Sequence, residues 1–338
     1  MISFFLSHLL ESTLVCLLLV SLACCLRKSA RARYAVLVLA AAKFAIPSIL
    51  LAKTGAEMAL FWPAASWLSL IANRVSSVWF ALFGFLSGGL DQSAYFAVRA
   101  ALLIWPLGTL ALLTLWFIRL RKRNSSYLTA SESELSALKR ASHDLGLRLP
   151  LALRLSDANM EPALWGILRP TITFPRGLAQ TLTPAELEAV LLHELAHARR
   201  CDNLSSAFVH LVVCLFWFHP VLWLIERRLN VERERACDET VIASGVAAAI
   251  YAAGILKVCK FHLFEATAGV STMSGADLTR RLEIILDNRI STRLLYIPHF
   301  LIACLALLIT LVPLAGGYCQ QCVSHLQKPA QTSLTEKK

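Results

Sequence analysis

The residues with the most specific chemical potential are His193-Glu194-Leu195-Ala196-His197, the pattern H-E-x-x-H. Histidines four positions apart lie one turn apart on the same face of a helix, so both imidazole rings can reach one metal ion. Glu194 follows the first histidine and can act as the base that takes a proton from a metal-activated water. The alternative is a pair of exposed helix histidines beside a solvated glutamate. We favour the metal site because the motif lies on a well-capped, half-buried helix.

A catalytic zinc ion needs three protein ligands and one open position, so a third ligand must come from another segment. The best candidate segment is 231–245, whose pattern predicts a helix. On it, Glu234 and Asp238 are four residues apart and share one face, so one can bind the metal while the other orients a histidine. Glu232 and Glu239 compete from other faces. Taken alone, such a charge run is more often a solvated helix surface.

The helix that carries the motif has a clear beginning in the letters TPAE. Thr183 is expected to be its N-cap, and Glu186 closes a capping box, with proline at the first helical position. Upstream, a second capping box predicts a helix over 131–145. Between these helices, 151–155 and 171–174 are short, apolar and compatible with strands, which predicts a small sheet. An edge strand of that sheet could dock an extended peptide substrate through main-chain hydrogen bonds.

The composition is typical of a membrane protein. Of the 338 residues, 57% are hydrophobic and 16% are charged, with a mean hydropathy of +0.60; a soluble domain carries about 25% charged residues. The net charge is +11, but the cations cluster beside apolar runs, where membrane topology and anionic lipid favour them. The sequence carries no zinc-finger, basic-zipper or RNA-binding signature, so we expect no direct nucleic-acid partner.

Four apolar segments are long enough to span a bilayer: 2–26, 34–52, 100–118 and 297–315. The basic letters RKSARAR follow the first segment and RLRKR follow the third, which predicts that both clusters are cytoplasmic and that the N-terminus faces outward. Residues 60–86 are apolar and rich in tryptophan, but Arg74 interrupts them. A span there would put the two basic clusters on opposite sides, so we expect an interfacial or partly re-entrant outer segment.

The expected organisation has four parts. Residues 1–118 would hold three transmembrane helices, with the outer interfacial segment at 53–99. Residues 119–290 would form a cytoplasmic zinc metallopeptidase domain. Residues 291–315 would contain the last transmembrane helix, and 316–338 a short outer tail.

Residues 205–225, within the expected cytoplasmic domain, are also apolar enough to span. A single crossing would put His193 and Glu234 on opposite sides of the bilayer, which a shared metal forbids. We therefore expect a buried helix, or a re-entrant hairpin bent near His219. His210 and His219 could be extra ligands or oxyanion donors, although histidines in a packed region more often only satisfy their own hydrogen bonds.

Two other pairs leave alternatives open. Lys43 lies in the middle of the second expected span, where a charge is costly, and Glu11 lies at similar depth in the first. They could form an ion pair, or Lys43 could snorkel or face a wet cavity. Among ten cysteines, Cys319 and Cys322 form a C-x-x-C in the expected tail, which could be a disulfide or part of a zinc site.

The stretches HELAHARRCD and FWFHPVLWLIERRLNVERERACDETV closely resemble the BlaR/MecR family of antirepressor metallopeptidases. The order of the spans, the lysine in the second span, and the stretches ILRPTITFPRGL and LTPAELEAVLLHELAH are also similar to it. The resemblance implies that His193, His197 and Glu234 bind zinc. It further implies that Glu194 is the general base, and that Asp238 supports the ligands without touching the metal.

The resemblance covers about residues 1–315 and also implies a fold. That fold is a mainly α membrane protein of about four transmembrane helices, with a cytoplasmic gluzincin-like α+β zinc peptidase domain, multi-pass in the bacterial inner membrane. The implied substrate is a BlaI/MecI-like transcriptional repressor or the chain itself, and a homodimer is left open. The best-known members sense β-lactams through an outer penicillin-binding domain. No S-x-x-K acylation motif follows residue 315, so we expect that sensor to be absent and the signal to come from 53–99, the tail or a partner.

Two other functions compete. A membrane-protein quality-control protease of the Ste24/HtpX type shares H-E-x-x-H and E-x-x-x-D with this chain. A non-catalytic membrane receptor or scaffold with a structural zinc is a different class. Glu194 argues against the receptor, because a structural site needs no base, whereas a metal closed by four protein ligands would favour it. The residues therefore predict a zinc metalloendopeptidase without identifying its substrate.

Overall fold

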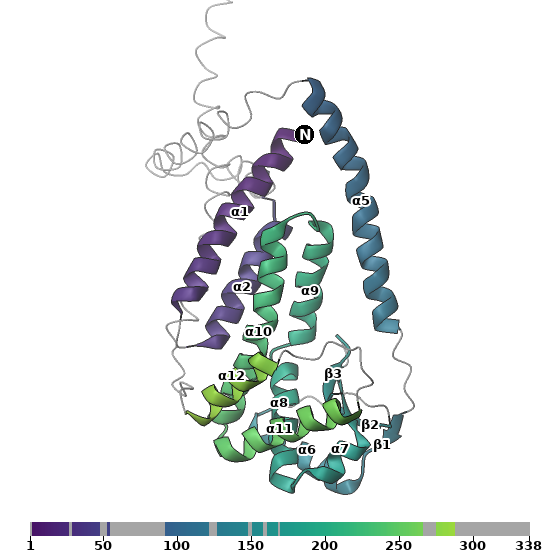
Figure 1. Cartoon of the computed structure of the whole chain (residues 1–338), viewed down its shortest axis with the longest axis vertical. Helices are drawn as coiled ribbons and strands as arrows, with labels where there is room; N and C mark the ends of the chain where they lie inside the picture. Colours follow the sequence, from purple (N-terminus) through teal and green to yellow (C-terminus); the bar gives the residue numbers. More distant parts are fainter. Residues whose placement is uncertain are drawn as a thin grey trace, which may run out of the picture.

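The structure is a computed structural model of the whole chain. It describes residues 2–26, 29–47, 53–54, 92–121, 127–147, 151–157, 161–167, 170–265 and 275–287. Long helices form an upper bundle, and a smaller unit with a sheet and shorter helices lies below it (Figure 1).

The upper bundle contains two helices from the start of the chain, one from its middle and a later hairpin. They are α1 (Ile2–Cys25), α2 (Ala30–Ala45), α5 (Gln92–Arg121), α9 (Asp202–Leu215) and α10 (Pro220–Ala243). Apolar side chains of α1, α2, α9 and α10 form one buried cluster, which includes Leu19, Leu37, Val213 and Leu222. The hairpin of α9 and α10 therefore packs among helices that are far away in the sequence.

Two of the described helices are long and apolar enough to cross a membrane. The qualifying stretches are His8–Cys25 in α1 and Leu103–Arg121 in α5. Large hydrophobic side chains are exposed on both helices, such as Leu18 on α1 and Leu103 on α5, which are 71% and 72% exposed. Such faces suit a lipid environment better than water.

The boundaries of these helices differ from those expected. The second expected span, 34–52, corresponds to α2, which begins at Ala30 and ends at Ala45. It ends there because Pro47 disfavours helical geometry in the residue before it. α5 begins at Gln92, earlier than the expected start at residue 100. The expected outer segment at 60–86, the last span at 297–315 and the tail lie outside the described residues.

The lower unit is built on a four-stranded sheet with the order β1-β2-β4-β3. Its strands are β1 (Tyr127–Thr129), β2 (Ala152–Ser156), β3 (Ala163–Trp165) and β4 (Thr171–Pro175). β2 and β4 are parallel, while β1 and β3 pair antiparallel with them at the two edges. Leu153 and Leu155 alternate with exposed residues along β2, so one face of the sheet is buried. β1 and β3 were not expected from the sequence.

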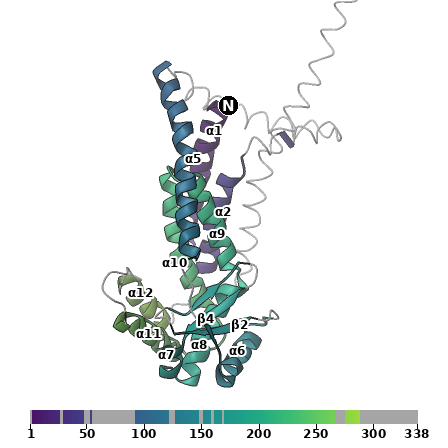
Figure 2. The same ribbon diagram turned by 90° about the vertical axis from the view of Figure 1, so that its right-hand side faces the viewer.

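Among the described residues, five helices complete the lower unit: α6 (Glu132–Asp144), α7 (Arg176–Thr181), α8 (Pro184–Arg199), α11 (Ala248–Glu265) and α12 (Gly275–Leu286). Figure 2 shows α6, α7 and α8 beside the strands β2 and β4. Ile172 and Phe174 of β4 share a buried cluster with Leu191 and Leu195 of α8 and with Val241 of α10. α10 therefore contributes to both cores, its first half above and its last turns below.

The structure joins Glu11 and Lys43 as an ion pair between α1 and α2. Their Oε1 and Nζ atoms are 3.4 Å apart, and the two side chains are 15% and 2% exposed. Lys43 also donates to the Ser12 hydroxyl at 3.4 Å. Of the two expectations for Lys43, the geometry supports the pair.

We expect Glu11→Gln and Lys43→Met each to lower the free energy of unfolding by about 3 kcal/mol, because each leaves a buried charge without its partner. The double variant should lose less than the sum of the two single losses. Unfolding in detergent micelles measures all three values. Strictly additive losses would contradict an energetic role for the pair.

Candidate metal centre

α8 places the two histidines of the motif on one face. Its start is fixed by Thr183, whose hydroxyl accepts from the amide of Glu186, while the Glu186 carboxylate accepts from the amide of Thr183 at 2.8 Å. The imidazole rings of His193 and His197 have centroids 4.9 Å apart and lie nearly perpendicular. Glu194, the residue after His193, is 6% exposed and lines one cleft together with both histidines.

α10 brings a carboxylate to these rings. The Oε2 atom of Glu234 is 3.4 Å from Nε2 of His193, and its Oε1 atom is 3.8 Å from Nε2 of His197. Both Nε2 atoms therefore face one carboxylate that comes from a different helix. Two imidazoles and one carboxylate are the ligand set of one common class of catalytic zinc site.

The other ring nitrogens already have partners. Nδ1 of His197 is 2.7 Å from Oδ2 of Asp202, at the start of α9. Nδ1 of His193 is 2.7 Å from the hydroxyl of Tyr251 on α11. Histidines that bind metals usually donate their second N–H to such an outer group, which fixes the ring and its tautomer. The arrangement therefore leaves both Nε2 atoms for a divalent cation.

Asp238 lies behind His193. Its carboxylate accepts from the Tyr251 hydroxyl at 2.6 Å and from Arg281 of α12 at 2.7 and 2.9 Å. Its Oδ1 atom is 3.6 Å from Nδ1 of His193. Asp238 thus positions the Tyr251 hydroxyl, which in turn bonds His193. The Nη1 atom of Arg281 is also 3.6 Å from Oε2 of Glu234.

The electrostatics of the cluster suit a cation. Burial alone would raise the pKa of Glu234, but His197, His193 and Arg281 hold this pKa well below its usual range. Burial alone would lower the pKa of His197, but Cys237, Glu234 and Asp202 raise this pKa well above its usual value. Both shifts favour positive charge beside the Glu234 carboxylate, which is the condition that a bound metal cation would satisfy.

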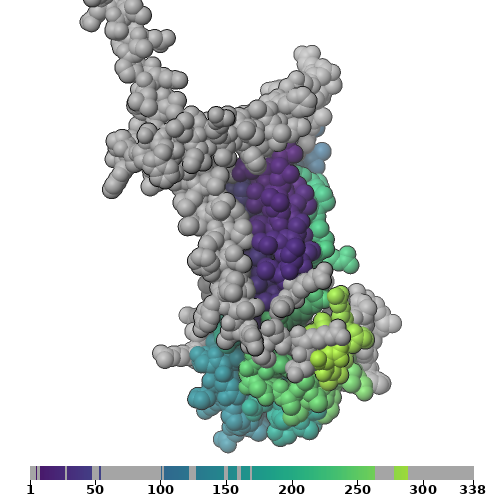
Figure 3. Space-filling view, turned by 90° about the vertical axis from the view of Figure 1, so that its left-hand side faces the viewer, coloured from purple at the N-terminus to yellow at the C-terminus, as the bar shows by residue number. Residues whose placement is uncertain are grey.

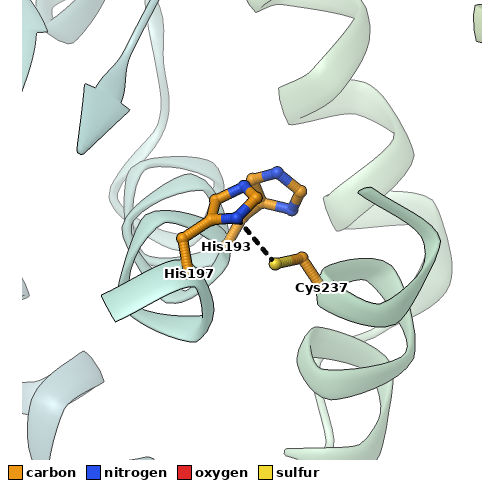
Figure 4. A group of neighbouring side chains, drawn as sticks. All are labelled: His193, His197 and Cys237. Carbon is orange, nitrogen blue, oxygen red and sulfur yellow. Dashed lines mark hydrogen bonds between the residues drawn. The ribbon is translucent and has the colours of Figure 1, made fainter. Parts of the chain in front are cut away.

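Cys237 offers a second set of three donors with the histidines, with atoms within 4.8 Å of one another. Figure 4 shows its thiol directed at His197, with Sγ 3.3 Å from Nδ1. That nitrogen is the one bonded to Asp202, and Arg200 also donates to the sulfur at 3.4 Å. A metal held by Cys237 and Nδ1 of His197 would have to break the Asp202 bond, whereas Glu234 faces both Nε2 atoms.

The donors line a cleft of about 490 Å³. One wall is the edge strand β3 with the residues before it, including Glu161 and Leu164. The amide of Asn203 at the start of α9 donates to the carbonyls of Leu164 and Gly166 at 2.9 Å each and fixes the strand there. A cleft of this size, with a strand along it, can hold an extended peptide.

The predicted residues fall into two groups. His193, Glu194, His197 and Glu234 line the cleft, and Asp238 lies behind His193. The other carboxylates of α10 and the two later histidines have other partners: Glu232 bonds Arg33 and Arg235, Glu239 bonds the start of α2, His210 bonds Glu226, and His219 bonds Thr13.

Sequence reasoning missed Asp202, Tyr251 and Arg281. Asp202 lies five residues after His197 in the stretch HELAHARRCD, so an acidic residue directly after the motif helix was an available signal. Tyr251 and Arg281 carried no local signal, because they reach the site only through the packing of α11 and α12.

Comparison with known proteins gives one family and several relatives. The family model described as BlaR1 peptidase M56 matches residues 3–285. A regulatory protein BlaR1 from Bacillus licheniformis is 29% identical over 160 residues, which are 46% of this chain and 26% of that protein. The methicillin resistance mecR1 proteins of Staphylococcus aureus and Staphylococcus epidermidis are each 25% identical over 146 residues, 42% of this chain and 25% of theirs. The match therefore spans about a quarter of the length of these relatives.

We expect Asp202→Asn to lower the affinity for zinc by about 10- to 100-fold, because His197 loses the carboxylate that orients its ring. Competition with a fluorescent chelator measures this affinity. Asp157→Asn, the same chemical change at an exposed residue, is the matched control and should bind zinc like the unaltered chain. Equal affinities for both variants would show that Asp202 does not support a ligand.

Proposed function

This chain belongs to the BlaR1 peptidase M56 family, and we propose that it is a membrane-embedded zinc metallopeptidase that hydrolyses peptide bonds on the cytoplasmic side. One observation carries the proposal. The two Nε2 atoms of the H-E-x-x-H helix face the Glu234 carboxylate, while both Nδ1 atoms are held by other groups. In this proposal His193, His197 and Glu234 are the zinc ligands, and Glu194 is the catalytic base.

The residues around the cleft have separate tasks. When bound, zinc would supply a water of lowered pKa and polarise the carbonyl of the substrate. Glu194 accepts a proton on its carboxylate from the attacking water and delivers it to the leaving amine. Among the described residues, no side chain forms an ion pair with Glu194, so this carboxylate is available for the proton. β3 would align the substrate main chain beside it.

The proposed role is regulatory: inactivation of a transcriptional repressor or cleavage of the chain itself. It is supported by the relatives, which are named as a regulatory protein and as methicillin resistance proteins. A partner of the BlaI/MecI repressor type is proposed on the same ground. A membrane location is supported by the two long apolar helices and by the family. Four spans in a bacterial inner membrane and a gluzincin-like domain are part of the same proposal.

The proposal is tested by Glu194→Ala. The variant should keep zinc, because all three proposed ligands remain, but should lose about 10²- to 10⁴-fold in cleavage rate, because the base is missing. His197→Ala should lose both zinc and cleavage. Zinc content is measured by mass spectrometry, and cleavage by new cytoplasmic N-termini in cells that carry each variant.

Glu188→Ala is the matched control, since Glu188 lies on the same helix and pairs with Arg140 at the surface. It should cleave like the unaltered chain. Equal turnover by the unaltered chain and Glu194→Ala would refute the role of the base. A few new N-termini in one repressor or in the chain itself would support the regulatory role, and many in unrelated membrane proteins would favour quality control.

A second prediction separates the two donor sets. Cys237→Ser should keep zinc and cleavage, because the thiol faces a nitrogen that Asp202 occupies, whereas Glu234→Ala should lose zinc. The same metal and cleavage measurements apply. Zinc lost from folded Cys237→Ser would instead indicate a site closed by the cysteine, as a structural zinc would have.

A further inference from the structure

A second cavity of about 660 Å³ lies where the bundle meets the lower unit. Its walls come from the end of α1 at Ala23 and Cys24, the start of α2 at Arg33, the middle of α10, and α12. On the face drawn in Figure 3, α1 lies above and α12 lies below. We call this space the arginine cavity, because five arginines line it: Arg33, Arg228, Arg235, Arg280 and Arg281.

The carboxylates of the arginine cavity are already compensated. Glu232 accepts from Arg33 at 2.7 Å and from Arg235 at 2.9 Å. Glu239 accepts from the amide of Ala30 at 2.6 Å. Asp238 is held by Arg281, as described for the metal centre. Three carboxylates against five arginines leave an excess of positive charge.

That excess is located on Arg228 and Arg280. Both are exposed, and within the described part of the chain neither forms an ion pair with a carboxylate. Arg228 donates to the sulfur of Cys24, at 3.0 Å. Two guanidinium groups at one cavity offer paired N–H donors to an anion, and phosphate is the anion whose oxygens fit this fork best.

The surroundings indicate where such a phosphate would come from. Above the cavity, α1 exposes Leu14, Leu17 and Leu18, of which Leu18 is 71% exposed. The exposed face of α1 runs from these leucines past Ser21 to Cys24, which lines the cavity. An apolar strip that ends in a cationic cavity fits a molecule with acyl chains and an anionic head group, and basic pockets at this level of membrane proteins bind such lipids.

We propose that the arginine cavity binds the phosphate head group of an anionic phospholipid whose acyl chains lie along the exposed face of α1. Arg228 and Arg280 bind the phosphate oxygens. Arg235 and Arg281 line both this cavity and the cleft of the metal centre. The head group would therefore lie next to Arg281, which bonds Asp238 and pairs with Glu234. The proposal concerns a lipid site and is independent of whether peptide bonds are cleaved.

The test uses the full chain in nanodiscs of phosphatidylcholine with phosphatidylglycerol, and counts retained lipids by native mass spectrometry. The unaltered chain should retain phosphatidylglycerol in preference to phosphatidylcholine. Arg228→Gln with Arg280→Gln should weaken that preference about tenfold, since each arginine near a bilayer surface adds to the attraction for anionic lipid. Arg140→Gln with Arg176→Gln removes the same charge from exposed positions of the lower unit and should keep the preference.

The outcomes separate the alternatives. Equal loss in both double variants would mean a general surface charge effect and would overturn the proposal, as would no loss in either. Inorganic phosphate that displaces phosphatidylglycerol at millimolar concentration would assign the cavity to a free anion, and a soluble hexaglutamate peptide that does so would assign it to a protein. Melting in pure phosphatidylcholine checks folding; if the double variant is unfolded, Arg280→Gln alone carries the test.

Discussion

The hairpin of α9 and α10 must return a carboxylate to the two histidines of α8. α9 has 14 residues and rises about 21 Å from Asp202, beside His197, to the turn at its far end. The same length counted down α10 from Pro220 ends at Arg233, so the next residue, Glu234, is back at the level of Asp202. Because the two helices are equally long between the turn and this level, Asp202 of α9 and Glu234 of α10 both reach His197. A shift of α10 by two residues along its axis would turn Glu234 away from both rings.

The hairpin also ties the site to the bundle. The upper half of α10 packs against α1 and α2 through Leu222, Ile225 and Leu229, and its last turns belong to the core of the lower unit. A movement of α1 or α2 relative to the lower unit would therefore act on the helix that carries Glu234. The arginine cavity lies at this junction, so the proposed head group would be in contact with the same helix as the proposed zinc ligand.

Charge compensation explains why so many elements meet at the site. Buried ionised groups are costly unless they are paired and hydrogen-bonded, and the cluster around the cleft contains several. Asp202 pairs with His197 and Arg200, while Asp238 pairs with Tyr251 and Arg281. These partners come from α8 and its C-cap, from α11 and from α12, so the donor geometry depends on the packing of the whole lower unit. The same compensation operates in the bundle, where Glu11 and Lys43 neutralise each other.

Local patterns in the sequence determined the elements that begin and end through short-range chemistry. The capping boxes at Ser131 and Thr183, the helical spacing of His193 and His197, and the shared face of Glu234 and Asp238 all depend on neighbours within four residues.

The strands β1 and β3 have three residues each and form only because β2 and β4 offer them edges. Tyr251 and Arg281 become part of the site only because α11 packs on α8 and α12 packs against α11 and α10. The proposed choice of Glu234 over Cys237 depends on which ring nitrogen Asp202 already holds. Contacts between distant segments decide these features, because no local residue pattern encodes which helices become neighbours.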